Sequence, residues 1–225
     1  MPRIEFTPPV LLPQGVTAKS VLNCAARGDH IDNEHSRALR NDYNVHTLHG
    51  AVAIATSLGL VDLATPLAAL TERCKKLSRT QAVVLDLAVH DFQTVEFGSI
   101  LQDMSAYAAK QQVSKAAFKL DPYAIRRRGH SPLPPMVATW VTCRRLTRLH
   151  EPSPLELLIL RAYTMHGMAA AQKQICTTPK QVSGDRDLQL TEYGVRMFLS
   201  RCAAKLSTTC DALADTAVKQ GWLVL

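Results

Sequence analysis

Histidine and aspartate side chains stand where they could hold a metal ion. His90 and Asp91 are adjacent, with His49 upstream and Asp121 downstream. Imidazole nitrogens and carboxylate oxygens suit a hard or borderline divalent metal, so this set fits a metal-dependent phosphohydrolase. Two adjacent residues are weak evidence for such a site, and we favour a helix turn that ends in His90, Asp91 and Phe92. We therefore expect neither a metal nor another cofactor.

Other enzyme signatures are absent from the sequence. The ten glycines never form the Gly-x-Gly pattern of dinucleotide and phosphate loops. The sequence also lacks the Gly-x-Ser-x-Gly nucleophile elbow and the His-Glu-x-x-His zinc motif. These observations favour a noncatalytic protein.

The positive charge is concentrated in the second half of the chain. Residues 1–120 hold 12 Lys+Arg against 11 Asp+Glu, a net charge of +1, and residues 121–225 hold 14 against 8, a net charge of +6. Between Asp121 and Glu151 lie six arginines and two histidines, with no lysine and no acid. Guanidinium groups make forked contacts with phosphate and stack on bases. The segment therefore predicts binding to nucleic acid. Two alternatives are that the arginines form a solvated face and that they bind an acidic protein.

We expect this binding surface to extend over neighbouring elements. Helical spacing puts Arg144 and Arg148 on one face with Arg145 beside them, and Trp140 one turn earlier could stack on bases. The sequence has no zinc-finger, RNP or leucine-zipper signature, so contacts with the backbone are expected, with RNA favoured over DNA. The predicted binding residues are Lys115, Lys119, Arg126, Arg127, Arg128, His130, Trp140, Arg144, Arg145 and Arg148.

Residues 46–51, with the sequence HTLHGA, resemble the phosphorylatable motif of histidine phosphotransfer domains. The resemblance implies that His46 accepts a phosphoryl group on a helix, that His49 is its basic neighbour and that Gly50 leaves room for a response regulator. A signalling module of this kind is one alternative function. The other interpretation of the motif is a pair of helix histidines beside a close-packing glycine.

Residues 183–199, with the sequence SGDRDLQLTEYGVRMFL, are similar to the end of a winged-helix regulator. In that family a hairpin with Asp and Arg precedes a helix that starts with Leu-Thr-x-x-Gly. The resemblance implies a DNA-binding regulator as a further alternative.

These candidate residues must be positioned by helices. The chain of 225 residues is 47% hydrophobic but only 5% aromatic, and it has few glycines, which favours helices over a β-sandwich or barrel. We expect an all-α fold, a helical array of two lobes. The predicted helices of the first lobe are 17–27, 33–45, 46–57, 60–76, 78–92 and 97–112.

The helix that follows Ser153 is the most clearly marked element. Ser153 can serve as N-cap, Pro154 fits the first helical position, and Glu156 completes a capping box. Residues 155–175 are apolar on nearly every face, which predicts a central buried helix with Arg161 and His166 in or beside the core. Two more helices are expected at about 191–206 and 208–220.

The chain divides into four expected parts. These are an extended Pro-rich arm at 1–15, an N-terminal helical lobe at 16–119, a basic Pro/Arg-rich connection and helix at 120–152, and a C-terminal helical lobe with an apolar tail at 153–225. The apolar side chains of arm and tail need a surface to cover them, and exchange of such arms builds filaments. No stretch suits a signal peptide or a membrane span.

From these features we predict a protein that coats or packages nucleic acid in the manner of a nucleocapsid or filament coat protein. It would contact the nucleic-acid backbone and self-associate through its terminal arms. We expect no membrane partner and an intracellular, cytoplasmic location, with a virion or nucleoprotein particle as the more specific option.

Changing Arg126, Arg127 and Arg128 together to alanine should weaken the binding of unrelated nucleic-acid sequences to a similar degree. Each phosphate contact that is lost lowers the slope of log affinity against log salt by about 0.7–0.9. A salt titration of affinity measures that slope, and an unchanged slope would show that the three arginines are solvated surface.

Overall fold

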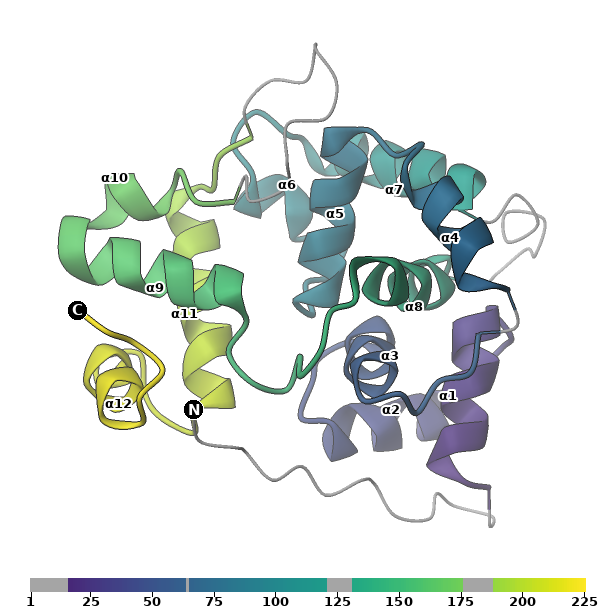
Figure 1. Cartoon of the computed structure of the whole chain (residues 1–225). Coiled ribbons are helices and arrows are strands. Elements are labelled where there is room, and N and C mark those ends of the chain that lie inside the picture. Colours follow the sequence, from purple (N-terminus) through teal and green to yellow (C-terminus); the bar gives the residue numbers. More distant parts are fainter. Residues whose placement is uncertain (1–15, 64, 121–130, 176–187) are drawn as a thin grey trace.

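The computed structural model describes residues 16–63, 65–120, 131–175 and 188–225. Within these ranges the backbone forms helices and one isolated bridge, between Leu101 and Leu190, with no named strand. The predicted all-α fold is confirmed. Two groups of helices lie beside one another (Figure 1). Among the described helices, none has the length and apolar character that a bilayer crossing would need.

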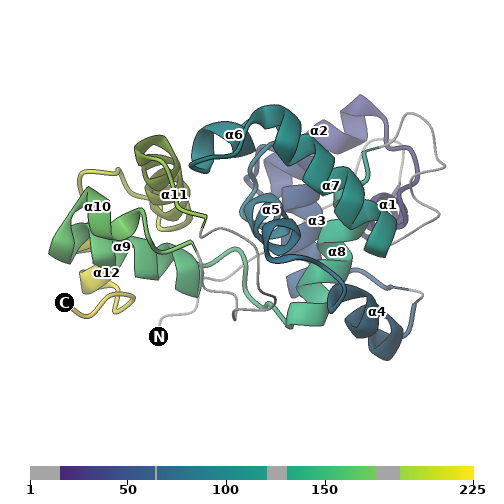
Figure 2. The same cartoon turned by 90° about the horizontal axis from the view of Figure 1, so that it is seen from above.

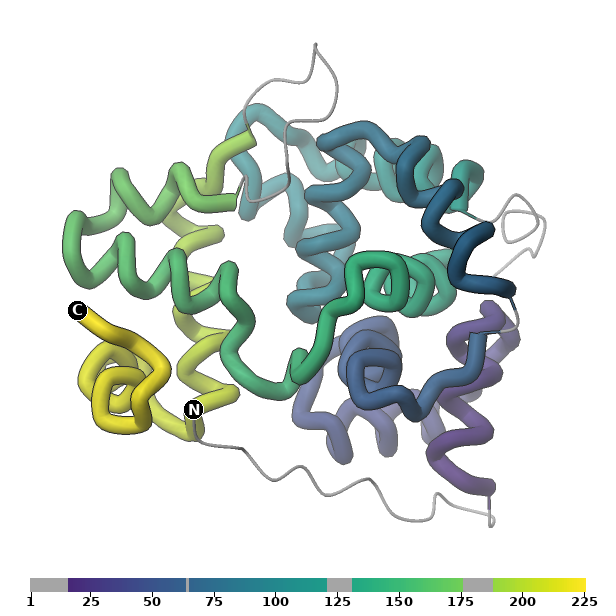
Figure 3. The backbone as a smooth tube through the Cα atoms, viewed as in Figure 1, coloured from purple at the N-terminus to yellow at the C-terminus, as the bar shows by residue number. Residues whose placement is uncertain are grey.

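The larger group, which we call the N-terminal lobe, is built around α8 (Leu133–Arg144). Side chains of α8 such as Met136, Val137 and Val141 are buried. In Figure 3 the chain of this helix runs through the middle of the lobe. The helices around it are α1 (Ala18–Arg27), α3 (Leu48–Ser57), α4 (Leu67–Cys74), α5 (Arg79–Val89) and α7 (Ala106–Leu120), and α2 (Asn33–Asp42) packs on α3. The sequence placed this helix in a basic connection at 120–152, whereas its apolar surface makes it the core of the lobe.

The smaller group, the C-terminal lobe, consists of α9 (Pro154–His166), α10 (Met168–Ala171), α11 (Glu192–Lys205) and α12 (Leu213–Lys219). The long apolar helix predicted at 155–175 is divided at Gly167, whose φ of 78° is a conformation that favours glycine. As a result α9 turns back through α10, and both pack against α11.

A short helix, α6 (Phe97–Ile100), joins the lobes, and Figure 2 shows it between α11 and α7. The Thr191 N–H donates to the Ile100 carbonyl at 2.7 Å, and the Gln102 N–H donates to the Gln189 carbonyl at 2.8 Å. Gly194 packs so closely on this turn that a Cβ atom there would overlap the Ile100 carbonyl oxygen. The contact between the lobes is therefore partly made of backbone.

Polar side chains mark where six of the described helices begin. Each accepts a hydrogen bond from a backbone N–H in the first turn, an arrangement that contributes about 1 kcal/mol, and the capping residues are Thr17, Asp32, Thr47, Ser78, Ser153 and Thr191. The capping box predicted for Ser153 and Glu156 is confirmed. Two predicted helices are interrupted, because Pro66 delays the start of α4 and Asp103, at a φ of 58°, separates α6 from α7.

The predicted burial of α9 is wrong on one face. Arg161 and His166 are exposed, and so are Leu158, Tyr163 and Met165. The helix covers α10 and α11 from the outside of the smaller lobe, so only a stripe of it, including Ile159 and Leu160, is buried. Although its sequence is apolar, this helix is not central in the lobe. Because Arg161 is exposed to solvent, it needs no buried partner.

Gly194→Ala tests the close approach of α11 to α6. Alanine should raise helix propensity by about 1 kcal/mol, but the overlap with the Ile100 carbonyl should outweigh this gain and lower the free energy of unfolding by about 1–3 kcal/mol. Urea unfolding measures the change, with Ser200→Ala, an exposed position of the same helix, as control. A more stable Gly194→Ala protein would contradict the packing described here.

Candidate functional site

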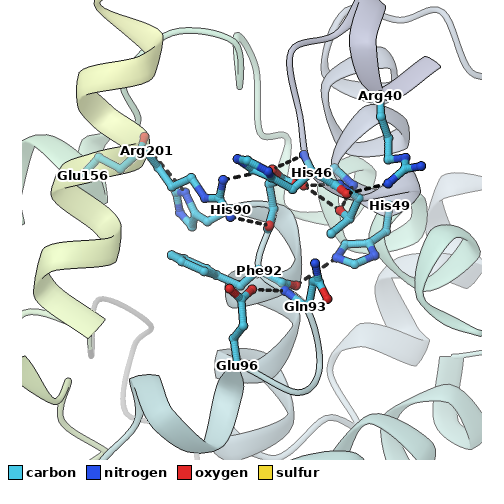
Figure 4. A network of polar contacts seen from close by, with 12 residues as sticks. Arg40, His46, His49, His90, Phe92, Gln93, Glu96, Glu156 and Arg201 are labelled. Atoms are coloured by element: carbon cyan, nitrogen blue, oxygen red, sulfur yellow. Dashed lines mark hydrogen bonds and ion pairs between the residues drawn. The ribbon is translucent and has the colours of Figure 1, made fainter. Parts of the chain in front are cut away.

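A pocket of about 220 Å³ lies between the lobes. Its walls come from the start of α3, the end of α5, the segment before α9 and the inner face of α11, and Figure 4 shows part of its polar network. Apolar side chains such as Ile54, Val89 and Leu149 line one part of it. The charged and imidazole groups of the lining are His46, His90, Asp91, His150, Arg201 and Lys205.

Asp91 joins the end of α5 to the start of α3. It has a φ of 66°, and its carboxylate accepts the His46 N–H at 2.7 Å, the Thr47 N–H at 2.9 Å and the Thr47 hydroxyl at 2.6 Å. Gly50 leaves room for this carboxylate, because a Cβ atom there would overlap it. Burial raises the pKa of Asp91 to about 6, against the hydrogen bonds from Thr47 that lower it. At neutral pH the carboxylate is therefore ionised.

Arg201 brings α11 to this carboxylate from the C-terminal lobe. Its Nη1 lies 3.6 Å from Asp91 Oδ2, and its Nη2 donates to the Asp91 carbonyl at 3.3 Å. The guanidinium also lies 5.5 Å from the centre of the Phe92 ring, a distance suited to a cation–π contact. One arginine thus binds both the side chain and the backbone of the residue that ends α5.

Glu156 provides a second connection between the lobes. Only 1% of this residue is exposed, and Oε2 accepts the Ser153 N–H and the Lys205 ammonium, both at 2.7 Å. Nδ1 of His90, from the N-terminal lobe, lies 3.7 Å from Oε1. Burial opposes the charge of Glu156, but Lys205 and then His90 outweigh it, so the pKa is lowered. The His90 ring also packs edge-on against Phe198.

The pocket histidines and acids do not make a metal site. Among the described residues, no group of three His, Cys, Asp or Glu side chains could hold a metal ion. Both oxygens of Asp91 are already bonded, and Nε2 of buried His49 donates to the Phe92 carbonyl at 3.0 Å. Burial lowers the pKa of His49, which favours its neutral form. Asp121, the fourth residue of the metal hypothesis, lies outside the described residues.

His46 is exposed but does not lie on a helix. Thr47 is the N-cap of α3, so the helix starts after the residue that the phosphotransfer resemblance puts on it. The backbone of His46 is held on both sides, by Asp91 at its N–H and by the Arg40 guanidinium at its carbonyl. The space beside Gly50, which the resemblance reserves for a partner, contains the Asp91 carboxylate.

The structure separates the residues predicted to bind nucleic acid. Trp140 is only 4% exposed and its indole N–H donates to Asp86 at 2.7 Å, so it is a core residue and offers no face for stacking. Arg148 is not on the helix face of Arg144, because α8 ends at Arg144, and it lies 3.8 Å from the Glu151 carboxylate. Arg126, Arg127, Arg128 and His130 lie outside the described residues.

The other predicted cations lie on α7 and at the end of α8, and both of these helices pack against α4. The side chains of Cys74 and Cys143, at the ends of α4 and α8, lie close enough to shift each other's pKa. The Lys119 ammonium, near the end of α7, donates to the Lys76 carbonyl and to Gln81 at the start of α5, each at 2.8 Å. We call the resulting group the basic cluster, and it consists of Lys75, Lys76, Lys115, Lys119, Arg144 and Arg145. Lys75 and Lys76 were not among the binding residues predicted from the sequence. Their position near Arg144 depends on the packing of α4 against α8, which the sequence does not reveal.

The apolar tail is partly covered by its own lobe. Trp222 and Leu223 are buried, and their N–H groups donate to the Ala217 carbonyl of α12. Val224 and Leu225 are exposed. The arm at 1–15 lies outside the described residues, so self-association through terminal arms stays a prediction.

In the winged-helix-like segment, Thr191 and Gly194 have local roles. Thr191 caps α11, and Gly194 allows the close contact with Ile100. Residues 183–187, in the proposed hairpin, lie outside the described residues.

No protein-family model, curated protein or solved structure matches this chain.

Replacing Glu156 with glutamine should lower the free energy of unfolding by about 3–5 kcal/mol at pH 7, because Lys205 would lose its buried counter-charge. Since the folded pKa lies below the ordinary value of 4.5, the ionised carboxylate stabilises the fold above that pH and loses its effect as the pH falls. The difference from the wild type should therefore shrink below about pH 4.5 in urea unfolding. Glu192→Gln, which breaks an exposed pair with Arg196, should change stability far less.

Equal stability of the Glu156→Gln and wild-type proteins at pH 7, or a difference that does not change with pH, would contradict this role of Glu156.

Proposed function

We propose that this protein binds nucleic acid through its phosphate backbone and coats it, with the basic cluster as the principal contact surface. The observation that carries the proposal is the composition of the helix ends that meet there. In the described ranges 67–89, 106–120 and 133–146, the only acids are Glu72 and Asp86. Asp86 is bonded to the Trp140 indole inside the lobe, and Glu72 pairs with Lys75 at 2.6 Å.

The local electrostatics of the helices explain only part of this cluster. A helix C-terminus carries a partial negative charge and favours a nearby cation, and Lys75, Lys119 and Arg144 each lie in or just after the last turn of a helix. That effect favours one cation at each end, but it does not account for the near absence of acids between them. A surface that excludes one sign of charge is suited to a partner of the opposite sign.

Arg144 and Arg145 are the two arginines of the basic cluster. Both are exposed, and Arg144 lies 5.4 Å from the centre of the Trp140 ring, which supports its side chain from below. Arg145 has a φ of 52°, a left-handed backbone conformation that ends α8. Arginine forks in such positions bind phosphate oxygens without reading base identity.

The coating part of the proposal requires several copies on one strand. Contacts with the backbone alone have no preferred position, so copies can bind next to one another along any sequence. Self-association through the arm at 1–15 and the exposed end of the tail would add to this, as the sequence analysis predicts.

The double variant Arg144→Gln with Arg145→Asn should bind two labelled oligonucleotides of unrelated sequence more weakly, and by the same factor. An exposed charge pair contributes up to about 1 kcal/mol, so the loss should reach up to roughly fivefold for each arginine. Asparagine tolerates the left-handed backbone at position 145, which preserves the end of α8. Fluorescence anisotropy at low salt measures both affinities.

A matched control removes the same charge elsewhere. Arg161→Gln with Lys219→Gln takes two exposed cations from the C-terminal lobe and should leave both affinities nearly unchanged. If the control and the cluster variant weaken binding equally, net charge rather than the basic cluster is responsible.

A further inference from the structure

Two aromatic rings are exposed on α7, beside the basic cluster. Tyr107 is 72% exposed and Phe118 is 62% exposed. At 100° per residue, positions 107, 111, 114 and 118 form one row along a helix. Gln111 and Ser114, between the two rings, are also exposed. The opposite side of α7, including Val113 and Leu120, is buried in the lobe.

Lysines lie on both sides of this row. Lys110 lies on one flank, and Lys115 lies on the other flank with Lys119, which already belongs to the basic cluster. The fifteen residues of α7 include no acid. The helix thus presents aromatic faces between cations, which is complementary to a strand that carries both bases and phosphates.

We infer that this face of α7 stacks unpaired bases on Tyr107 and Phe118 while Lys110 and Lys115 contact phosphates, so that the ligand is single-stranded nucleic acid. The inference rests on the proposed function and specifies its ligand. Stacking on exposed rings needs no particular base, because every base has an aromatic face. It does require that the base is not already enclosed in a duplex.

The spacing of the rings places the two stacked bases apart along the strand. Tyr107 and Phe118 are eleven positions apart, which is roughly 16 Å along a helix that rises about 1.5 Å per residue. Neighbouring bases in a duplex strand are about 3.4 Å apart. The two rings therefore receive bases from separate positions of the strand, several nucleotides apart.

The test uses the full chain, a labelled single-stranded oligonucleotide of mixed sequence, and the same oligonucleotide in a duplex. Tyr107→Ala with Phe118→Ala should bind the single strand at least about fivefold more weakly for each ring, from the usual effect of losing a stacked base. Its affinity for the duplex should stay within about twofold of the wild type, because the lysines remain. Both rings are exposed, so the melting temperature should change little, and it is recorded for each variant.

Tyr193→Ala, an exposed tyrosine on α11, is the matched control and should leave both affinities unchanged. An equal loss for single strand and duplex, or no loss for either, would overturn the stacking role. If the Arg144 and Arg145 variant still weakens binding in that case, the proposed function stands without it. If the wild type binds neither probe, both proposals fail. A double alanine variant that loses self-association but keeps its affinity for the single strand would assign the face to a second copy of the chain.

Discussion

Two buried carboxylates set the arrangement of the lobes. A carboxylate removed from water needs an opposite charge and hydrogen bonds, and neither Glu156 nor Asp91 finds all of these in its own segment. Glu156 takes a lysine from α11 and faces a histidine from the end of α5. Asp91 takes backbone donors from the start of α3 and an arginine from α11. Because α11 supplies a cation to each acid, moving it away would remove Lys205 from Glu156 and Arg201 from Asp91.

The molecule thus has two groups of cations, one between the lobes and one in the basic cluster. Arg201 and Lys205 pair with Asp91 and Glu156 between the lobes, so their charges stabilise the fold. The basic cluster lies on the N-terminal lobe, where helix ends meet and where the described acids are few. Arg144 and Arg145 of this cluster are exposed, so no buried acid takes up their charge. The face of α7 that carries Tyr107 and Phe118 continues from this cluster.

The sequence predicted the features that depend on local chemistry. The cap at Ser153, its capping box with Glu156 and most helices follow from side chains within one turn of each other. It failed where the outcome depends on what packs against a helix. Trp140 was expected to be accessible and Arg161 to be buried, and the structure shows the reverse for both. A tryptophan in a basic segment is buried because α8 is surrounded, and an arginine in an apolar helix is exposed because α9 has neighbours on one side only. The convergence of Lys75 and Lys76 with Arg144 likewise requires contacts between distant segments.

The most direct test of the central claim is the affinity of the unmodified protein for two single-stranded oligonucleotides of equal length and unrelated sequence at low salt. Recognition through the backbone predicts that both bind, with affinities within a few-fold of each other, and that added salt weakens both in parallel. Failure to bind either oligonucleotide, or tight binding of only one, would contradict the account.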